Sequence, residues 1–551
     1  MAKSSKIRAS KQPYISPSQG VLSCFGLPFS GSLSDDNRWV VLAKQIPWDF
    51  LVNIYEKQMS NDKTGAGGIN PRVALGSLII KHICDLSDRE TIQQISENVY
   101  MQYFIGYSGF SNTAPFDPSL FVELRKRLGL EQINAINERI IRFIQSKQDK
   151  KLKEENKSET IDENKVEKDK GAESEIISSE VAEKDKDAEI KNSGNLEEST
   201  PPVTNRGKLI IDATCCPQDI AYPTDLNLLN DAREKSEELI DLLYQKALHG
   251  EKPRTYRRNA RKLYLAEAQK KSSSAKFIHK ANGKQLSFLG RNIRSIHSLL
   301  DKYQVIPLNR KQHKYFLVIQ TLFDQQEYMH KNKVHSIEHR IVSIHQPHVR
   351  PIVRGKRNAK VEFGSKIEVS WTNGFAFLDE LEWDAFNEGT RLKVSVEKYR
   401  ERFGYYPEEV LADQIYCTRE NRKYLKELNI KLRAKPLGRP SLSSAVEVHV
   451  RPGERNPIEG VFGQGKTAYG MNRIKARLAQ TSGSWIATIL MVINLVKITG
   501  LIRHSLILSV RTFSAWILEF YHNYYGNESV KFKWSFAAQK VPVDGGFFSR
   551  P

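Results

Sequence analysis

The sequence predicts a mixed α/β protein, in which an all-α N-terminal region precedes a mixed sheet with one large helical insertion. Residues 71 to 129 carry apolar positions at helical spacing. After residue 200, short apolar runs of strand length alternate with helical segments. Between about 226 and 331, four segments repeat charged and apolar residues with a helical period. We therefore expect the sheet to be interrupted by a helical insertion over 226–331.

Composition points to a nucleic-acid partner. The chain has 551 residues and a formal net charge of +20, from 84 Lys and Arg against 64 Asp and Glu. Such a surplus predicts an acidic polymer as partner, with nucleic acid favoured over an anionic membrane. The five cysteines are scattered and form no C-x-x-C pair, which favours reduced thiols. We expect a soluble protein of the cytoplasm.

The N-terminal part, residues 1–146, is expected to be a helical domain. Ser87 and Glu90 form a helix-capping pattern at the start of "SDRETIQQISENVYMQYFIG". The segment "FDPSLFVELRKRLG" ends in basic residues and Gly129, which is typical of a helix C-terminus. Several short helices with a basic end suit a DNA-binding domain, and a packing or dimerisation domain fits the same features.

Residues 147–200 are expected to form an acidic linker. The segment contains 11 Lys against 17 Asp and Glu, with no aromatic residue and no proline. It cannot bury enough apolar surface to offset the entropy lost on ordering. We therefore predict a disordered or loosely helical linker that divides the chain in two.

Strands are expected in the C-terminal part, residues 201–505, which precedes a tail at 506–551. "KLIIDAT" (208–214) and "EEVLADQ" (408–414) are short apolar runs with an acid near their end. Two further segments, at 339–355 and 360–372, have the composition of paired strands.

The last part of this region, from 457 to about 502, is mostly helical in pattern. Its apolar run begins at Trp485 and is interrupted by Asn494 and Lys497. These interruptions favour a buried core helix over a membrane span.

Three acids are candidate metal ligands. Asp212 and Asp413 stand at the ends of expected strands, and Glu459 opens the late helix. Carboxylates at strand ends meet at one edge of a sheet, and three oxygen donors there suit Mg²⁺ or Mn²⁺. Two such ions can hold the attacking and leaving oxygens of a phosphodiester. A single acid at a strand end more often caps a loop, so the hypothesis depends on all three together.

The late helix also carries two cations. Arg455, Glu459 and Lys466 are spaced by four and seven residues, which places them along one helix face. The same stretch, from Gly460 to Thr467, matches the nucleotide-binding pattern G-x-x-x-x-G-K-[ST]. That pattern needs an apolar strand before the glycine loop, and "HVRPGERNPIE" is charged and contains two prolines. An NTPase is therefore disfavoured.

At these residues the sequence resembles the DDE transposases of bacterial insertion sequences. "RNPIEGVFGQGKTAYGMNRIKARL" is similar to their R-x3-E-x6-K pattern, "IIDAT" to the strand with the first catalytic aspartate, and "LADQIYCTRENRKYLKELNIKLRAKPLGRP" to the segment following the second. The resemblance implies a ribonuclease H-like catalytic core with Asp212, Asp413 and Glu459 as the catalytic, metal-binding triad. It departs from the full pattern at Pro452, where the family has a tyrosine.

The resemblance also implies the reaction and its partners. A DNA transposase would cleave the ends of its element and join the 3′-hydroxyl to target DNA with two Mg²⁺ or Mn²⁺ ions. Its partners would be the terminal inverted repeats, target DNA and a second subunit in a homodimeric synaptic complex. The alternative is a catalytically inactive DNA-binding protein or repressor derived from a transposase.

Several basic residues are expected to contact DNA. They are Arg455, Lys466, Arg473 and Lys475 in the late segment, and Arg354, Lys356 and Arg357 in the run "VRPIVRGKRNAK". A second basic run, "RTYRRNARKLY" at 254–264, could grip phosphates, although a solvated helix face explains it equally well.

Overall fold

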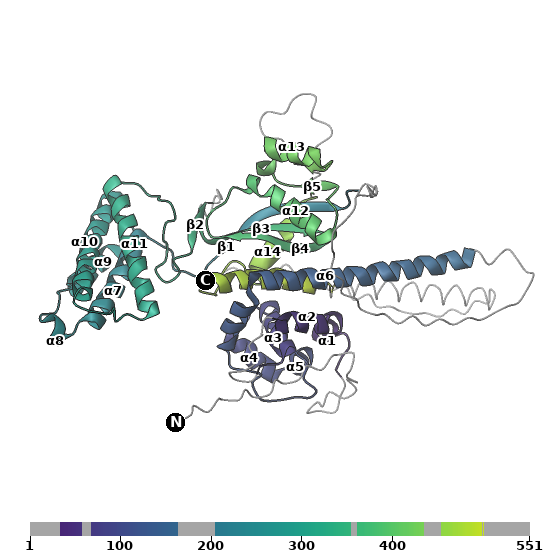
Figure 1. Cartoon of the computed structure of the whole chain (residues 1–551), viewed down its shortest axis with the longest axis horizontal. Helices are drawn as coiled ribbons and strands as arrows, with labels where there is room; N and C mark the ends of the chain where they lie inside the picture. The colour runs from purple at the N-terminus through teal and green to yellow at the C-terminus, as the bar shows by residue number, and fades with distance from the viewer. Residues whose placement is uncertain are drawn as a thin grey trace, which may run out of the picture. The chain divides into compact units, whose positions relative to one another are not determined.

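The computed structural model is a mixed α/β structure (Figure 1). It describes residues 33–57, 68–163, 204–353, 361–434, 453–498 and 500. Three expected DNA contacts, Arg354, Lys356 and Arg357, lie outside the described residues.

The N-terminal region is helical. Its first described helices are α1 (Arg38–Gln45), α2 (Trp48–Lys57), α3 (Pro71–Ile83), α4 (Asp88–Glu97) and α5 (Val99–Phe104). The ring of Phe104 lies 5.3 Å from the rings of both Trp39 and Trp48, which centres the apolar packing on α5. The expected capping box is present at the start of α4, because the side chains of Ser87 and Glu90 each accept a hydrogen bond from the backbone N–H of the other.

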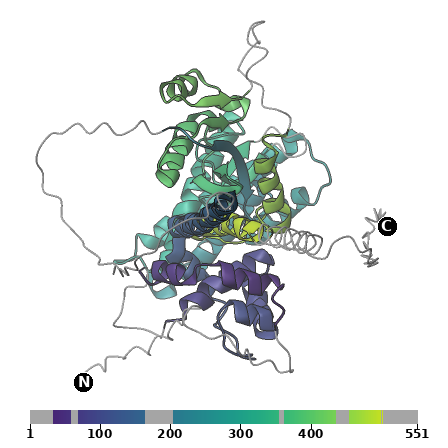
Figure 2. The same ribbon diagram turned by 90° about the vertical axis from the view of Figure 1, so that its right-hand side faces the viewer.

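A long helix, α6 (Leu120–Glu163), follows and is kinked at Gly129, whose φ of 47° lies in the left-handed region. Its continuation through Glu163 makes the start of the segment 147–200 helical, and the remainder of that segment lies outside the described residues. Asn137 of α6 donates to the backbone oxygen of Ala376 and accepts from Asn494. Figure 2 shows α6 beside the C-terminal helix that carries Asn494.

That C-terminal helix is Ala479–Ile498, which is long and apolar enough to cross a membrane by length and composition. Most of its residues are buried inside the protein, as expected for a core helix.

The described strands form one mixed sheet in the order β2-β3-β1-β5-β6, with β4 also paired to β3. Pairs β1–β3, β2–β3 and β3–β4 are antiparallel, whereas β1–β5 and β5–β6 are parallel. The strands are β1 (Lys208–Pro217), β2 (Arg350–Val353), β3 (Val361–Thr372), β4 (Phe375–Glu382), β5 (Glu409–Leu411) and β6 (Lys431–Arg433). The expected strand at 339–355 is reduced to the short β2, and β4 is an additional strand.

Helices cover the sheet. They are α12 (Leu392–Phe403), α13 (Arg419–Glu427) and α14 (Asn456–Ala468), with two 3-10 turns at Glu388–Thr390 and Gln414–Tyr416. Leu209 and Ile211 of β1 and Val410 of β5 share an apolar cluster with Val396 of α12. This cluster lies on one face of the sheet.

Five described helices separate β1 from β2, where the sequence pattern predicted four. They are α7 (Asp225–Leu243), α8 (Lys246–His249), α9 (Arg257–Ala268), α10 (Ala275–Leu300) and α11 (Arg310–Asn332). The additional one, α8, is a single turn. Apolar residues of α7, α10 and α11 form one buried cluster, so this insertion has a core of its own.

Candidate active site

Asp212 of β1 and Asp413, which lies just after the end of β5, are at the same level of the sheet. In the parallel β1–β5 pair, Ile210 is in register with Leu411, and each aspartate follows its register partner by two residues. Side chains alternate along a strand. Because Leu209, Ile211 and Val410 belong to the cluster with α12, Asp212 and Asp413 point to the opposite face.

Arg455 joins the two aspartates. Its Nη2 lies 3.2 Å from Oδ2 of Asp212, and its Nη1 lies 3.2 Å from Oδ1 of Asp413. Arg455 caps the start of α14, which packs against β1. Arg455 and Asp212 are mostly buried, whereas the Asp413 side chain is 59 % exposed. One guanidinium therefore forms ion pairs with two carboxylates, of which one is buried and the other is exposed to solvent.

The environment of Asp212 disfavours its charge. Burial raises the pKa of Asp212 to about 6, although the Arg455 guanidinium and a hydrogen bond from the Ala213 backbone both act to lower it. The carboxylates of Glu388 and Asp413 add to the increase. A carboxyl group with this pKa lies in an environment where further positive charge is stabilising.

Glu459 lies apart from this pair. It is an exposed residue in the first turn of α14, one helical turn after Arg455. Among the described residues, no three His, Cys, Asp or Glu side chains form a group that could hold a metal ion. The donor chemistry of Asp212 and Asp413 fits a hard cation, because both are oxygen donors and already share one positive charge. The structure thus brings together two of the three acids.

The other predicted cations lie on two segments. Lys466 is on α14. Burial raises the pKa of the Cys215 thiol on β1, and the charge of Lys466 partly opposes this increase. Arg473 and Lys475 flank Ile474, which bridges to Gln218 just beyond β1. The Nε of Arg473 lies 2.9 Å from Oδ1 of Asp219.

The glycines of the nucleotide-binding pattern lie within α14, so the stretch is a helix and forms no phosphate-binding loop. A side chain at Gly460 or Gly463 would meet no atom of the described residues within 4 Å. A side chain at Gly465 would meet Met471 at 2.9 Å. The phosphate-binding loop that an NTPase would need is therefore not formed by this stretch.

A buried carboxyl group near the site was not among the predicted residues. Glu368 of β3 accepts a hydrogen bond of 2.7 Å from the hydroxyl of Tyr416, and its second oxygen has no hydrogen-bond partner among the described residues. Burial raises the pKa of Glu368 well above its ordinary value. Its register partner is Ala213, so it lies on the face of β1 opposite Asp212. In the alternating pattern of the strand, Glu368 falls on the same side as Lys366 and Ser370, so the sequence alone contains no signal that it is buried.

Two family models match the chain. A transposase DDE domain matches residues 410–496, and a transposase domain matches residues 28–127. An uncharacterized protein, ORF8 in the nfe locus of Rhizobium meliloti, is 41 % identical over 65 residues, which cover 12 % of this chain and 31 % of that protein. The chain thus spans under a third of the length of this relative. No solved structure matches the chain.

Proposed function

We propose that this chain, which belongs to the DDE transposases of insertion sequences, cleaves the ends of its element and joins the freed 3′-hydroxyl to target DNA. One observation carries the proposal: Asp212 of β1 and Asp413, just after the parallel neighbour β5, both bind the Arg455 guanidinium. Two carboxylates that share one cation at the edge of a sheet have the donor chemistry of a Mg²⁺ or Mn²⁺ site.

The proposal includes a ribonuclease H-like core. The positions of the three acids support it: Asp212 lies on β1, Asp413 directly follows β5, the parallel neighbour of β1, and Glu459 lies on the later helix α14. The sheet combines antiparallel and parallel pairs about β1, and the helical insertion falls between the first two strands.

In the proposed mechanism, Asp212, Asp413 and Glu459 would hold two divalent ions through their carboxylates. When bound, these ions would offset the charge on the attacking and leaving oxygens of the phosphodiester. Arg455 orients both aspartates on one face of the sheet, and with Lys466 it would hold phosphate oxygens near the cut. Glu459 completes the set only if its side chain turns from solvent towards the aspartates.

DNA is the proposed substrate and partner. Arg473 and Lys475, on the segment beside the end of β1, would contact its backbone, as would Arg354, Lys356 and Arg357. The helical N-terminal domain would bind the terminal inverted repeats. Because two element ends must meet before strand transfer, we propose a homodimer as the active form.

The catalytically inactive alternative is favoured by one observation. Glu459 does not form a metal-holding group with the two aspartates among the described residues. A repressor derived from a transposase would need the DNA contacts and would have no need for three acids.

Metal-dependent cleavage separates the two functions. Asp212→Asn, Asp413→Asn and Glu459→Gln should each abolish Mg²⁺-dependent cutting of DNA that carries the element ends, while binding in EDTA changes little. Asp301→Asn is the control, because Asp301 is an exposed acid on the insertion. Full cleavage by any of the three variants would overturn the catalytic assignment. No cleavage by the unmodified chain, with intact DNA binding, would favour the repressor.

A further inference from the structure

Positive charge is concentrated on one part of the helical insertion. From Lys252 to Arg294, which covers α9 and most of α10, the sequence has 13 Lys and Arg and a single acid, Glu267. The neighbouring helix α7 has six acids against two basic residues. The insertion is therefore strongly basic along α9 and α10 and acidic along α7.

The cations of this stretch are exposed, and most are not neutralised. All 13 side chains belong to exposed residues. Three of them form ion pairs: Lys252 and Arg257 with Asp241, and Lys270 with Glu267. The other ten have no ion pair with any described residue: Arg254, Arg258, Arg261, Lys262, Lys271, Lys276, Lys280, Lys284, Arg291 and Arg294.

These cations follow the helix period. Lys276, Lys280, Lys284 and Arg291 are spaced by four, four and seven residues, which places them along one face of α10. At about 1.5 Å per residue this row is about 22 Å long. That length matches about six phosphates of one DNA strand, at about 3.4 Å each.

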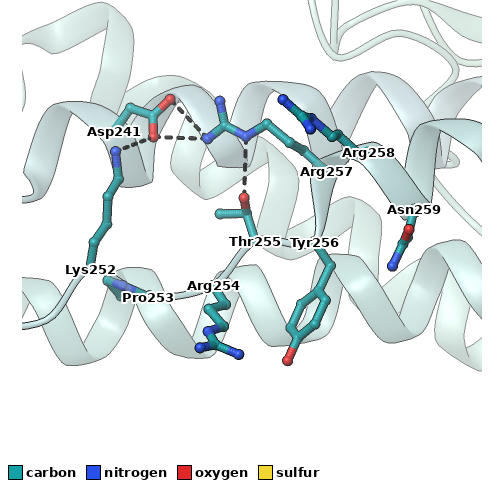
Figure 3. A pocket seen from close by; sticks show the side chains of 9 residues that line it. All are labelled: Asp241, Lys252, Pro253, Arg254, Thr255, Tyr256, Arg257, Arg258 and Asn259. Carbon is teal, nitrogen blue, oxygen red and sulfur yellow. Dashed lines mark hydrogen bonds and ion pairs between the residues drawn. The ribbon is translucent and has the colours of Figure 1, made fainter.

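A shallow cavity of about 620 Å³ continues this face at the start of α9 (Figure 3). Its lining includes Arg254, Tyr256 and Arg258. Tyr256 has a φ of 54°, a left-handed conformation that is unfavourable for a tyrosine. The guanidinium of Arg291 lies 4.7 Å from the centre of the Tyr256 ring, so the row on α10 reaches the cavity.

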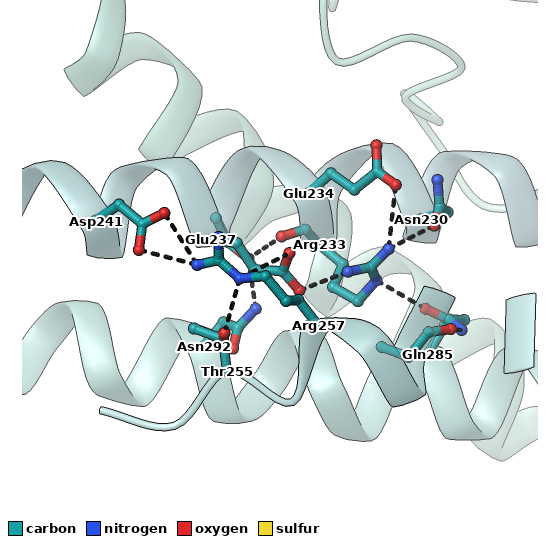
Figure 4. Close-up of polar contacts among 11 residues, drawn as sticks. Asn230, Arg233, Glu234, Glu237, Asp241, Thr255, Arg257, Gln285 and Asn292 are labelled. Carbon is teal, nitrogen blue, oxygen red and sulfur yellow. Dashed lines mark hydrogen bonds and ion pairs between the residues drawn. The ribbon is translucent and has the colours of Figure 1, made fainter. Parts of the chain in front are cut away.

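Two acids of α7, Glu237 and Asp241, fix the position of Arg257, which lines the cavity. Arg257 binds both oxygens of Asp241 at 2.8 and 2.9 Å. Glu237 binds Arg257 and the buried Arg233, which also binds Asn230 and Gln285 (Figure 4). Asp241 is occupied by Arg257 and Lys252, and Glu237 by Arg233 and Arg257, so neither acid pairs with the nearby Arg254 or Arg258.

We infer that the insertion is a second DNA-binding surface, on which the cations of α9 and α10 hold the phosphate backbone of a duplex and the cavity at Arg254 and Arg258 receives one phosphate. The inference rests on the proposed function, since it takes DNA as the substrate. DNA is favoured over an anionic membrane because ten cations without an ion pair to any described residue face solvent, against three large exposed apolar side chains on the same stretch, Tyr256, Phe277 and Ile278.

Two charge variants of the full chain test the inference. The test variant is Arg258→Gln, Arg261→Gln, Lys280→Gln and Lys284→Gln. The matched control removes four exposed cations elsewhere on the insertion: Lys302→Gln, Arg310→Gln, Lys311→Gln and Lys314→Gln. Binding to a duplex with an element end and its flanking DNA is measured in EDTA over a range of salt concentrations, so that no step depends on metal.

Each lost phosphate contact should reduce the slope of log affinity against log salt by about 0.9. We expect the test variant to lose about 2 to 4 units of slope and at least about tenfold in affinity, and the control to stay within about threefold. Equal losses in both variants would overturn the inference, as would intact DNA binding with loss of binding to phosphatidylserine vesicles. If the test variant fails to fold, Arg254→Gln with Arg258→Gln is measured in the same way.

This result is independent of catalysis. A smaller salt-dependence slope in the test variant than in the control supports the second DNA-binding surface. This holds even if the Asp212→Asn experiment contradicts metal-dependent cleavage. Conversely, cleavage that depends on Asp212 together with identical slopes would leave the proposed function intact and remove the second surface.

Discussion

The guanidinium of Arg455 lies 3.2 Å from the carboxylate of Asp212, and the same group binds Asp413. Burial is the largest influence on the pKa of Asp212, and Arg455 is the main influence that opposes it. The ion pair between Arg455 and Asp212 therefore influences whether the Asp212 carboxyl group is charged before any metal binds.

Replacing Arg455 should make Asp212 a weaker acid. In Arg455→Gln the positive charge that stabilises the carboxylate is lost, so the pKa of Asp212 should rise further above about 6. Arg455→Lys should show a smaller increase, because an ammonium group keeps the charge and loses the fork that reaches both aspartates. Carbon-detected NMR of the aspartate side chains during a pH titration measures the change. An unchanged pKa in Arg455→Gln would contradict this role.

Divalent-metal binding should depend on pH. The pKa of Asp212 is raised to about 6, so its carboxyl group is neutral below that pH and becomes an anionic ligand above it. Affinity for Mn²⁺ should therefore increase as the pH rises through about 6, by up to about tenfold per unit below the pKa. Electron paramagnetic resonance of free Mn²⁺ measures binding without a cleavage assay. Asp212→Asn should flatten this dependence, and a flat profile in the unmodified chain would exclude Asp212 as a ligand.

Part of the site could be predicted because it follows from strand geometry. Asp212 and Asp413 end short apolar runs, and parallel pairing brings such positions together without any knowledge of the long sequence between them. The ion pairs that Arg455 forms with both aspartates could not be predicted. Helical spacing indicated only that Arg455 shares a helix face with Glu459 and Lys466, and it did not indicate which residues of the sheet Arg455 contacts. Glu368 was missed because only the register with β1 shows that it is buried.

The fold was predictable where periodicity was strong. The insertion helices and the core helix Ala479–Ile498 follow their apolar patterns. The segment 339–349 has strand composition and forms no strand, because Ile341 and Ile344 pack into the apolar cluster of the insertion instead. Its tertiary environment overrode the local preference.

The glycines of α14 differ in what surrounds them, which predicts different effects of substitution on stability. Gly463→Ala should stabilise the protein by up to about 1 kcal/mol, because a side chain there meets no atom in the described part of the chain within 4 Å. Gly465→Ala should gain less or lose stability, since its Cβ would meet the buried Met471 at 2.9 Å. Chemical denaturation measures both.

The bulkier Gly463→Leu tests why the glycine is present. If DNA approaches the helix backbone there, cleavage and binding should fall while stability is kept. Loss of folding would instead indicate close packing by another part of the chain.

Asn494, which interrupts the apolar run of the core helix, should be essential for stability. Its side chain accepts from the backbone nitrogen of Ala376 at 2.9 Å and donates to the Ala376 oxygen at 2.7 Å and to Asn137 at 3.0 Å. Asn494→Leu keeps the branched shape of the side chain and leaves the buried backbone N–H of Ala376 and Oδ1 of Asn137 without this partner. The cost should be roughly 2 to 4 kcal/mol.

The control for this variant is Asn332→Leu, at an exposed position of α11, which should change the free energy of unfolding by less than about 0.5 kcal/mol. Asn137→Leu, combined with Asn494→Leu in a double-mutant cycle, separates the contact with α6 from the contact with β4. A coupling above about 0.5 kcal/mol is expected, because the two amides bind each other and share the Ala376 oxygen. Additive losses would mean that α6 and the core helix stabilise β4 independently.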